Sequence, residues 1–301
     1  MDNRQLANFK EQLKIINQSK STISAYTACI QKFLTWLEAQ NILDVRAVTG
    51  RSLNQYQLEL MSKNYSLETV HLHLRALRRF FEYLVNTNQI LLNPTEKLKF
   101  PKLGKRLPKI IPTEAEINKL LNTPNTGTKQ GIRNKTILEL LYSSGIRRNE
   151  CANLTIHDVD YSGGLLKVTQ GKGKKDRVVP IGEQSCKYLK EYILKVRPHY
   201  LKNKEERALF INRLGQPLSS QMVGIMVREE TRKAGIKINI SPHAIRRAFA
   251  THLIKHEAHP LYVQRLLGHS QSETLNKYVK VAGIEVKQTH LKTHPREKDK
   301  R

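Results

Sequence analysis

Apolar residues recur at helical spacing through much of the first hundred positions of the chain. Residues 21–40 begin with Ser and Thr, which suit a helix cap, and place apolar side chains at Ile23, Tyr26, Ile30, Phe33, Leu34 and Leu37. Residues 66–86 keep the same period with Val70, Leu74, Leu77, Phe81 and Leu84. Strand-like alternation is scarce here, and the pattern predicts a helical domain over residues 1–100.

The face of residues 66–86 opposite the apolar one is basic and carries His71, Arg75, Arg78 and Arg79. A charged helix face is usually only solvated, and contact with a DNA backbone is the alternative. Both interpretations stay open at this point.

A segment rich in proline and lysine follows. Residues 93–113 hold four prolines, one glycine and five lysines, which interrupt a helix and disfavour burial. We expect an extended linker over residues 101–112, whose cations Lys102, Lys105 and Arg106 could follow a nucleic-acid groove.

Beyond the linker, the pattern alternates between helix and strand. Helices are expected over 113–122 and 130–143, followed by a β-rich patch between residues 154 and 180 and then by further helices. The last 16 residues lose the apolar period and are expected to form a flexible basic tail over 286–301. The chain is therefore predicted to be mainly α, with a small β-sheet inside a mixed α+β domain over residues 113–285.

Composition indicates the class of partner. The 52 Lys and Arg residues against 26 Asp and Glu give a formal net charge of +26, which opposes compactness unless a polyanion balances it. Residues 1–100 hold 13 basic and 8 acidic residues, whereas residues 101–301 hold 39 and 18. Nucleic acid is the polyanion that this composition favours, and most of the phosphate-facing surface is expected in the second part.

The cysteines and the apolar runs bear on the cellular compartment. Cys29, Cys151 and Cys186 are far apart and show no CxxC spacing, which argues against a disulfide framework or a thiolate zinc site. We expect buried thiols in a reducing cytoplasm. No basic start precedes a long apolar run, and no run of about 18 apolar residues occurs, so a soluble cytoplasmic protein is expected.

Two helix starts carry clustered cations. SPHAIRRAFATHL (241–253) begins with a Ser cap and a Pro in the first turn, and His243 and Arg246 then share one face at i, i+3. In LYSSGIRRNECANL (141–154), Gly145 ends one helix and Arg147 opens the next, where the positive helix dipole makes a cation unfavourable without an anion such as phosphate. A solvated helix edge and an Arg147–Glu150 pair are the structural alternatives.

GKGKKDRVVP (171–180) holds two glycines and four basic residues but lacks the spacing of a P-loop and leads into a strand. A β-hairpin is the better interpretation. Lys172 would then lie at its tip, either solvated or as a proton donor in a groove, and Lys174 and Lys175 are candidates for DNA contacts.

LLGHSQSETLNKYVK (266–280) places His269 directly after a glycine and Tyr278 nine residues later. A single tyrosine is far more often a half-buried side chain than a nucleophile. His252 and His256 are spaced i, i+4 as zinc ligands can be, but HEAH is not HExxH and no carboxylate is spaced to complete a site, so zinc is not expected.

Taken together, these motifs resemble the signature of the tyrosine recombinases, which comprise the phage integrases and the Xer chromosome-dimer resolvases. That signature is an Arg, a β-hairpin Lys, His-x-x-Arg, Leu-Gly-His and a Tyr about nine residues on, and its positions here are Arg147, Lys172, His243, Arg246, His269 and Tyr278. The resemblance covers about residues 3 to 285 and is nearest to the compact Xer-like branch. Arg247, where Xer-like sequences often have His, and Cys151, where Leu is usual, depart from the pattern outside these six positions.

The resemblance implies a DNA clamp made of a core-binding domain and a catalytic domain, acting as a site-specific recombinase without metal or nucleotide cofactor. Tyr278 would be the nucleophile that forms a 3′-phosphotyrosyl intermediate, and Lys172 would be the general acid. The implied partners are a double-stranded recombination site and further copies of the chain, joined into a tetramer through the C-terminal tail. A type IB topoisomerase-like nicking-closing enzyme and a catalytically silent DNA-binding regulator remain as alternatives.

Overall fold

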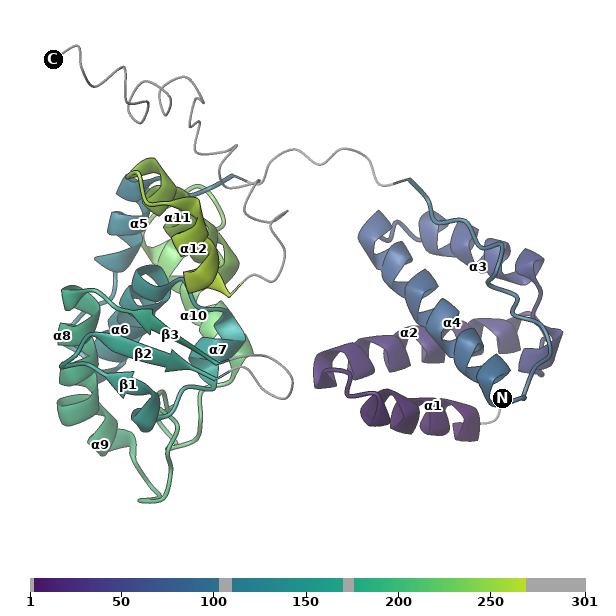
Figure 1. The fold of residues 1–301 in the computed structure, drawn as a ribbon, viewed down its shortest axis with the longest axis horizontal. Coiled ribbons are helices and arrows are strands. Elements are labelled where there is room, and N and C mark those ends of the chain that lie inside the picture. Colours follow the sequence, from purple (N-terminus) through teal and green to yellow (C-terminus); the bar gives the residue numbers. More distant parts are fainter. Residues whose placement is uncertain (1–2, 103–109, 170–175, 269–301) are drawn as a thin grey trace, which may run out of the picture. The chain divides into compact units, whose positions relative to one another are not determined.

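The computed structural model describes residues 3–102, 110–169 and 176–268. The chain divides into two compact units, Met1–Pro108 and Lys109–Arg301 (Figure 1), and each has its own buried apolar residues. The boundaries expected from the sequence, at residues 100, 112 and 285, remain predictions.

The first unit is a bundle of helices. They are α1 (Asn3–Ile15), α2 (Lys20–Ala39), α3 (Gly50–Ser62) and α4 (Leu67–Asn86), with a 3-10 turn at Val45–Ala47. α4 packs against α2 and α3, and α1 packs against α2 (Figure 1). The two helices predicted from apolar periodicity are confirmed as α2 and α4, and Ser66 caps α4 by accepting a hydrogen bond from the Thr69 N–H.

Aromatic side chains fill much of the core of this unit. Phe9, Phe33, Phe80 and Phe81 are all fully buried. The rings of Phe9 and Phe80 meet edge to face at 5.4 Å, and those of Phe33 and Phe81 at 6.2 Å. These contacts hold α1 and α2 against α4 and add to the stabilisation from burial alone.

The chain beyond α4 folds back along that helix. Nε2 of His71 is 2.7 Å from the Pro101 carbonyl oxygen, and Arg78 donates a hydrogen bond of 3.3 Å to the Leu98 carbonyl. The Arg78 guanidinium also lies 4.7 Å from the centre of the Phe100 ring. Part of the basic face predicted on this helix is therefore used to hold the segment from Leu98 to Pro101.

The second unit combines helices with a small sheet. Its helices are α5 (Glu114–Leu121), α6 (Lys129–Ser144), α7 (Arg148–Ala152), α8 (Glu183–Glu191), α9 (Arg197–Tyr200), α10 (Ser220–Lys233), α11 (Pro242–Lys255) and α12 (Pro260–Leu267), with a 3-10 turn at Ile156–Asp158 and a π turn at Tyr192–Val196. The described strands are β1 (Val159–Asp160), β2 (Leu165–Val168) and β3 (Arg177–Pro180). Mainly α with a small sheet is the fold predicted from the sequence, and it is confirmed.

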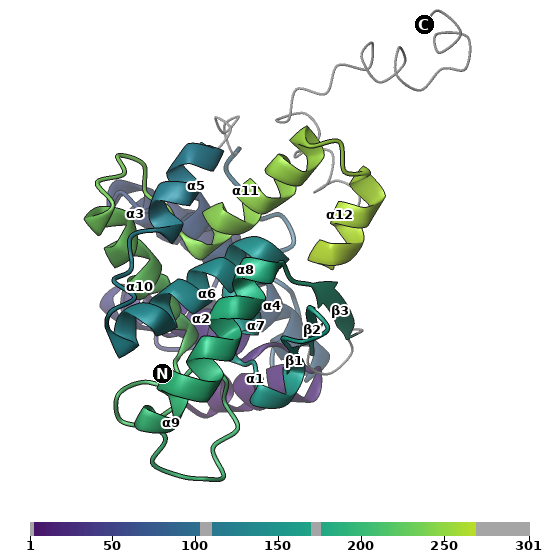
Figure 2. The same cartoon turned by 90° about the vertical axis from the view of Figure 1, so that its left-hand side faces the viewer.

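The strands form one antiparallel sheet in the order β1-β2-β3. Val168 pairs with Arg177 and Leu165 with Pro180, which confirms the predicted pairing of two strands across residues 169–176. β3 also contacts α6 and α12, and α12 in turn packs against α11 (Figure 2). The sheet edge, α6 and α12 therefore meet at one place.

The cysteine prediction is partly wrong. Cys29 and Cys151 are buried free thiols, and burial raises the pKa of Cys151 to about 12. Cys186, in the first turn of α8, is only partly buried, and the next residue, Lys187, is exposed.

Among the described helices, none combines the length and the apolar character needed to cross a bilayer.

Candidate active site

Arg147 sits at the junction between α6 and α7. Gly145 ends α6 in the left-handed conformation with φ of 60°, and a Cβ there would lie 2.3 Å from Cδ1 of Phe249, so the turn requires glycine. Arg147 is the N-cap residue of α7. Its side chain is 36% exposed and donates a hydrogen bond of 2.9 Å to Oε1 of Glu150, which confirms the ion pair considered from the sequence.

Arg246 comes from the first half of α11, which begins at Pro242 behind the Ser241 cap as predicted. The residue is 4% exposed. Its two terminal nitrogens donate hydrogen bonds of 2.6 Å to the carbonyl oxygens of Gly145 and Leu267. Burial of a guanidinium requires such partners, and these two carbonyls fix Arg246 between the end of α6 and the end of α12.

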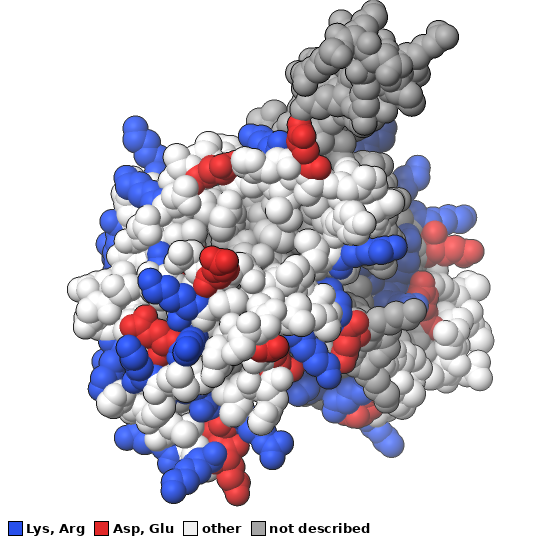
Figure 3. Space-filling view, turned by 60° about the vertical axis from the view of Figure 1, so that its left-hand side comes forward, with Lys and Arg blue, Asp and Glu red and all other residues white. Residues whose placement is uncertain are grey.

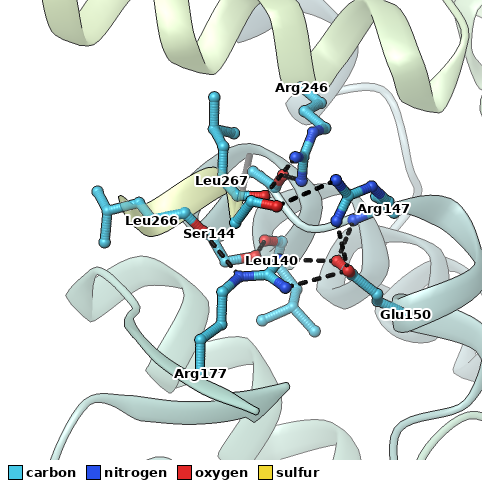
Figure 4. Close-up of polar contacts among 10 residues, drawn as sticks. Leu140, Ser144, Arg147, Glu150, Arg177, Arg246, Leu266 and Leu267 are labelled. Carbon is cyan, nitrogen blue, oxygen red and sulfur yellow. Dashed lines mark hydrogen bonds and ion pairs between the residues drawn. The ribbon is translucent and has the colours of Figure 1, made fainter. Parts of the chain in front are cut away.

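The carboxyl end of α12 is bound by arginines from separate parts of the chain. Arg177 donates to the Leu266 carbonyl at 2.9 Å, Arg246 to the Leu267 carbonyl at 2.6 Å, and Arg147 to the Gly268 carbonyl at 3.4 Å (Figure 4). The last carbonyls of a helix lack partners within the helix and carry the negative end of its dipole. They therefore act as a common acceptor that draws the three guanidinium groups together.

A single carboxylate holds two of these arginines. Glu150 accepts hydrogen bonds from both Arg177 and Arg147, including the Arg147 backbone N–H at 2.7 Å. Burial by itself would raise the pKa of Glu150. The hydrogen bonds from Arg177 and Arg147, together with the charge of Arg177, outweigh this effect and lower the pKa to about 2. Glu150 is therefore ionised at neutral pH.

His243 lies on α11 beside this group of arginines. The residue as a whole is exposed. The surrounding protein nevertheless keeps some water away from the imidazole, which lowers the pKa of His243. The positive charges of Arg246, Arg148, Arg247 and Arg147 lower it further. The imidazole is therefore neutral at pH 7, a state in which one ring nitrogen can accept a proton.

The structure thus brings together three of the six residues predicted to be catalytic, Arg147, His243 and Arg246. The other three, Lys172, His269 and Tyr278, lie outside the described residues, as do the predicted DNA contacts Lys105, Arg106, Lys174 and Lys175. The last described residue is Gly268, and His269 follows it in the sequence.

The remaining DNA-binding candidates belong to the first unit. Arg75 is exposed and donates to the His71 carbonyl at 3.3 Å, and Arg79 is exposed and pairs with Glu82 at 3.2 Å. Arg78 is engaged with Leu98 and Phe100, as described above, and Lys102 is exposed. Arg75 and Lys102 therefore have the most freedom to meet a phosphate.

Arg177 and the role of Glu150 toward it were not foreseen from the sequence. Arg177 was only counted among the four basic residues of GKGKKDRVVP, and its partners Glu150 and Leu266 lie far away along the chain. Neighbouring charge patterns give no signal for such a contact. The one available indication is that Arg177 opens a strand that must pack on the core.

The paired histidines considered as zinc ligands have other partners. His252 is buried, with Nδ1 2.9 Å from the Tyr142 hydroxyl and Nε2 3.0 Å from the Pro112 carbonyl. His256 is exposed and lies 3.0 Å from the Glu114 carboxylate. These contacts attach α11 to α6 and to the chain around the start of α5. The described residues include no group of three metal-ligating side chains.

Charge on the described surface is mixed on the face shown in Figure 3, where basic and acidic side chains are interspersed below a broad neutral area. The positive excess is therefore not concentrated at the centre of this face.

Solved structures of DNA-acting integrases and recombinases share this fold. The structure superimposes on the Tn1549 transposon integrase solved with a circular intermediate DNA, with a TM-score of 0.74 at 18% identity over 96% of this chain and 98% of the integrase. It also matches the XerA recombinase, with a TM-score of 0.55 at 24% identity over 97% and 99% of the two chains. This is the fold of the DNA recombinases that use tyrosine.

The sequence establishes the family. The profile of the phage integrase family matches residues 112–283, and that of the phage integrase N-terminal SAM-like domain matches residues 6–90. Tyrosine recombinase XerC 2 of Ralstonia nicotianae is 36% identical over 95% of this chain and 84% of its own, and tyrosine recombinase XerD of Staphylococcus saprophyticus is 34% identical over 95% and 98%. The chain belongs to the phage integrase family and is a tyrosine-type, Xer-like site-specific recombinase.

Proposed function

We propose that Arg147, Lys172, His243, Arg246, His269 and Tyr278 form the catalytic site of this recombinase, and that Tyr278 attacks a DNA phosphodiester. The observation that carries the proposal is the convergence of Arg147 and Arg246, from α7 and α11, beside a neutral His243. No described contact favours the topoisomerase-like or the non-catalytic alternative.

The chemistry requires charge stabilisation and proton transfer. As the phenolic oxygen of Tyr278 bonds to phosphorus, negative charge develops on the nonbridging oxygens, which the guanidinium groups of Arg147 and Arg246 match. His243 accepts the phenolic proton, because phenol has a pKa near 10 and ionises little at pH 7. Lys172 protonates the departing 5′ oxygen, and His269 donates a hydrogen bond to the phosphate.

The product is a 3′-phosphotyrosyl bond, which retains the free energy of the phosphodiester. Attack by the 5′ hydroxyl of a second strand reverses the step, returns the proton and releases Tyr278. Cleavage and rejoining therefore balance without an added reactant.

The proposed partner is a double-stranded recombination site, contacted by Arg75, Lys102 and the predicted linker and hairpin cations. Structures in the same fold class include a λ integrase dimer bound to a core site and a λ integrase tetramer bound to a Holliday junction. We extend DNA binding and assembly into a tetramer to this chain, with the C-terminal tail passing between copies. Integration, excision, inversion and dimer resolution all use this chemistry.

Tyr278→Phe tests the proposal. The variant removes the nucleophilic oxygen and nothing else, so we expect DNA binding close to that of the intact protein and no covalent adduct on a nicked suicide duplex. The duplex carries a half-site that the protein itself selects from random sequences. Denaturing electrophoresis reports the adduct, and an adduct formed by the Phe variant would disprove the assignment of Tyr278.

A further inference from the structure

Arg177 and Arg147 share Glu150 unequally. Arg177 uses both terminal nitrogens, with Nη1 3.1 Å from Oε1 and Nη2 2.8 Å from Oε2 of the carboxylate. The Arg147 side chain makes one bond of 2.9 Å to Oε1. A two-pronged bond of this kind is the stronger and better oriented of the two, so the carboxylate is held chiefly by Arg177 (Figure 4).

The exposures of the three groups assign them different roles. The side chains of Arg177 and Glu150 are each 10% exposed, whereas that of Arg147 is 36% exposed. The third nitrogen of Arg177 is also occupied, because Nε donates to the Leu266 carbonyl. With all its nitrogens bound inside the protein, Arg177 supports its neighbours and does not face the substrate, while Arg147 remains open to solvent on one side.

Charge explains why the second arginine is needed. A buried carboxylate paired with Arg147 alone would form a neutral ion pair and would offset the charge that attracts a phosphate. With Arg177 present, the three groups together carry a net charge of +1, and that excess lies on the side of Arg147 that is open to solvent.

We propose that Arg177 is a positioning residue for DNA cleavage, which neutralises Glu150 so that the charge of Arg147 remains available to the scissile phosphate, and which fixes the carboxyl end of α12 at the same time. This inference rests on the proposed function. It adds a residue that acts through Glu150 and touches no reacting atom.

The test compares single and double variants of the full-length protein on the nicked suicide duplex described above. Arg177→Met keeps the volume and removes the charge, and we expect the single-turnover cleavage rate at saturating DNA to fall about tenfold or more. Arg177→Lys restores one charge without the two-pronged bond and should have an intermediate rate. The double variant R177M/E150Q removes the carboxylate that needs neutralising, and should cleave faster than Arg177→Met and within about threefold of E150Q alone.

The pH dependence separates this role from general loss of structure. Without Arg177, the pKa of Glu150 rises because its main hydrogen bonds and nearest positive charge are gone, while its burial remains. Acidification then protonates Glu150 and frees Arg147, so the rate of Arg177→Met relative to the intact protein should rise as the pH falls from 7 toward 5.

Arg197→Met is the matched control, because Arg197 is a buried arginine that binds the Glu206 and Ala208 carbonyls away from this site. Its relative rate should not change with pH.

The outcomes distinguish the two proposals. If the intact protein forms no adduct, the proposed function is wrong and the role of Arg177 is wrong with it. If the intact protein cleaves and Arg177→Met cleaves equally fast, or if R177M/E150Q is slower than Arg177→Met, the role of Arg177 alone is overturned.

Discussion

His243 combines exposure with a lowered pKa, which suits a group that must accept a proton at neutral pH. Because the base has to be unprotonated, cleavage is expected to be constant between about pH 6.5, the ordinary pKa of histidine, and about pH 8. It should decline as the pH falls through the lower pKa of His243 in this protein. The measurement is the single-turnover cleavage rate at subsaturating DNA, which reports the free protein. His243→Gln should be slow and should lack this acidic limb, and a midpoint above 6.5 would contradict the proposed role.

Single residues of the site were predictable to the extent that their partners are close in sequence. Arg147 and Glu150 are one helical turn apart, so spacing alone suggested their ion pair. Arg177 lies 27 positions from Glu150 and 89 from Leu266. Such contacts depend on how the sheet packs against α7 and α12, and no local pattern encodes them.

Helix boundaries show where the sequence pattern loses precision. The predicted helix at 21–40 is observed as Lys20–Ala39, with Ser19 as the cap. Ser19 accepts the hydrogen bond from the Thr22 N–H, and since Ser21 and Thr22 are also able to cap a helix, periodicity could not choose among them. At α5, where Thr113 is the cap, the predicted range 113–122 and the observed Glu114–Leu121 likewise differ by a single residue at each end.

The packing of α3 against α4 makes the first unit sensitive to acid. His73 of α4 is 2% exposed, with Nδ1 2.9 Å from the Tyr56 hydroxyl of α3, and burial lowers its pKa to about 4. Since the folded form holds His73 neutral, its contribution is complete above about pH 6.5 and is lost as the pH falls toward 4. The expected loss at pH 5 is about 2 kcal/mol of the free energy of unfolding.

Trp36 reports this transition, because it is the single tryptophan of the chain and lies in the same core as His73. Urea unfolding followed by its fluorescence at pH 7 and pH 5 gives the comparison. His73→Gln can still bond to Tyr56 but does not titrate, so its stability should change less between the two pH values. Equal changes in the two proteins would show that His73 is not responsible.

At the scale of the whole molecule, the charge of +26 predicts binding to DNA that weakens steeply with salt. Each phosphate contact contributes about 0.9 to the slope of log affinity against log salt concentration. Arg75→Gln should reduce the magnitude of this slope by about 0.9, the value of one phosphate contact, because Arg75 is exposed and its side chain donates to a backbone carbonyl. Arg46→Gln is the control, since Arg46 already pairs with Asp44 at 2.7 Å. An unchanged slope for Arg75→Gln would show that Arg75 makes no phosphate contact.

Assembly on paired sites should depend on the tail. Val279, Val281, Ile284 and Val286 offer a small apolar set ahead of a polar basic end, enough to dock on a neighbouring copy. Truncation after Lys280 is expected to leave binding to a single half-site within severalfold of the intact protein, and to reduce cooperative binding to paired half-sites and strand exchange sharply. Gel-shift titrations on the two substrates measure this. Recombination of paired sites at the intact rate would show that the tail makes no contact between copies.

The three arginines that hold the carboxyl end of α12 bind its main-chain oxygens, which limits the sequence changes that related proteins can accept there. Each residue added to or removed from a helix turns its end by about 100°, so a one-residue change in length would direct the terminal carbonyls away from all three guanidinium groups at once. A change of side chain leaves those oxygens in place. Related sequences are therefore expected to differ by substitutions within α12. Insertions and deletions are expected in the loops before and after α11.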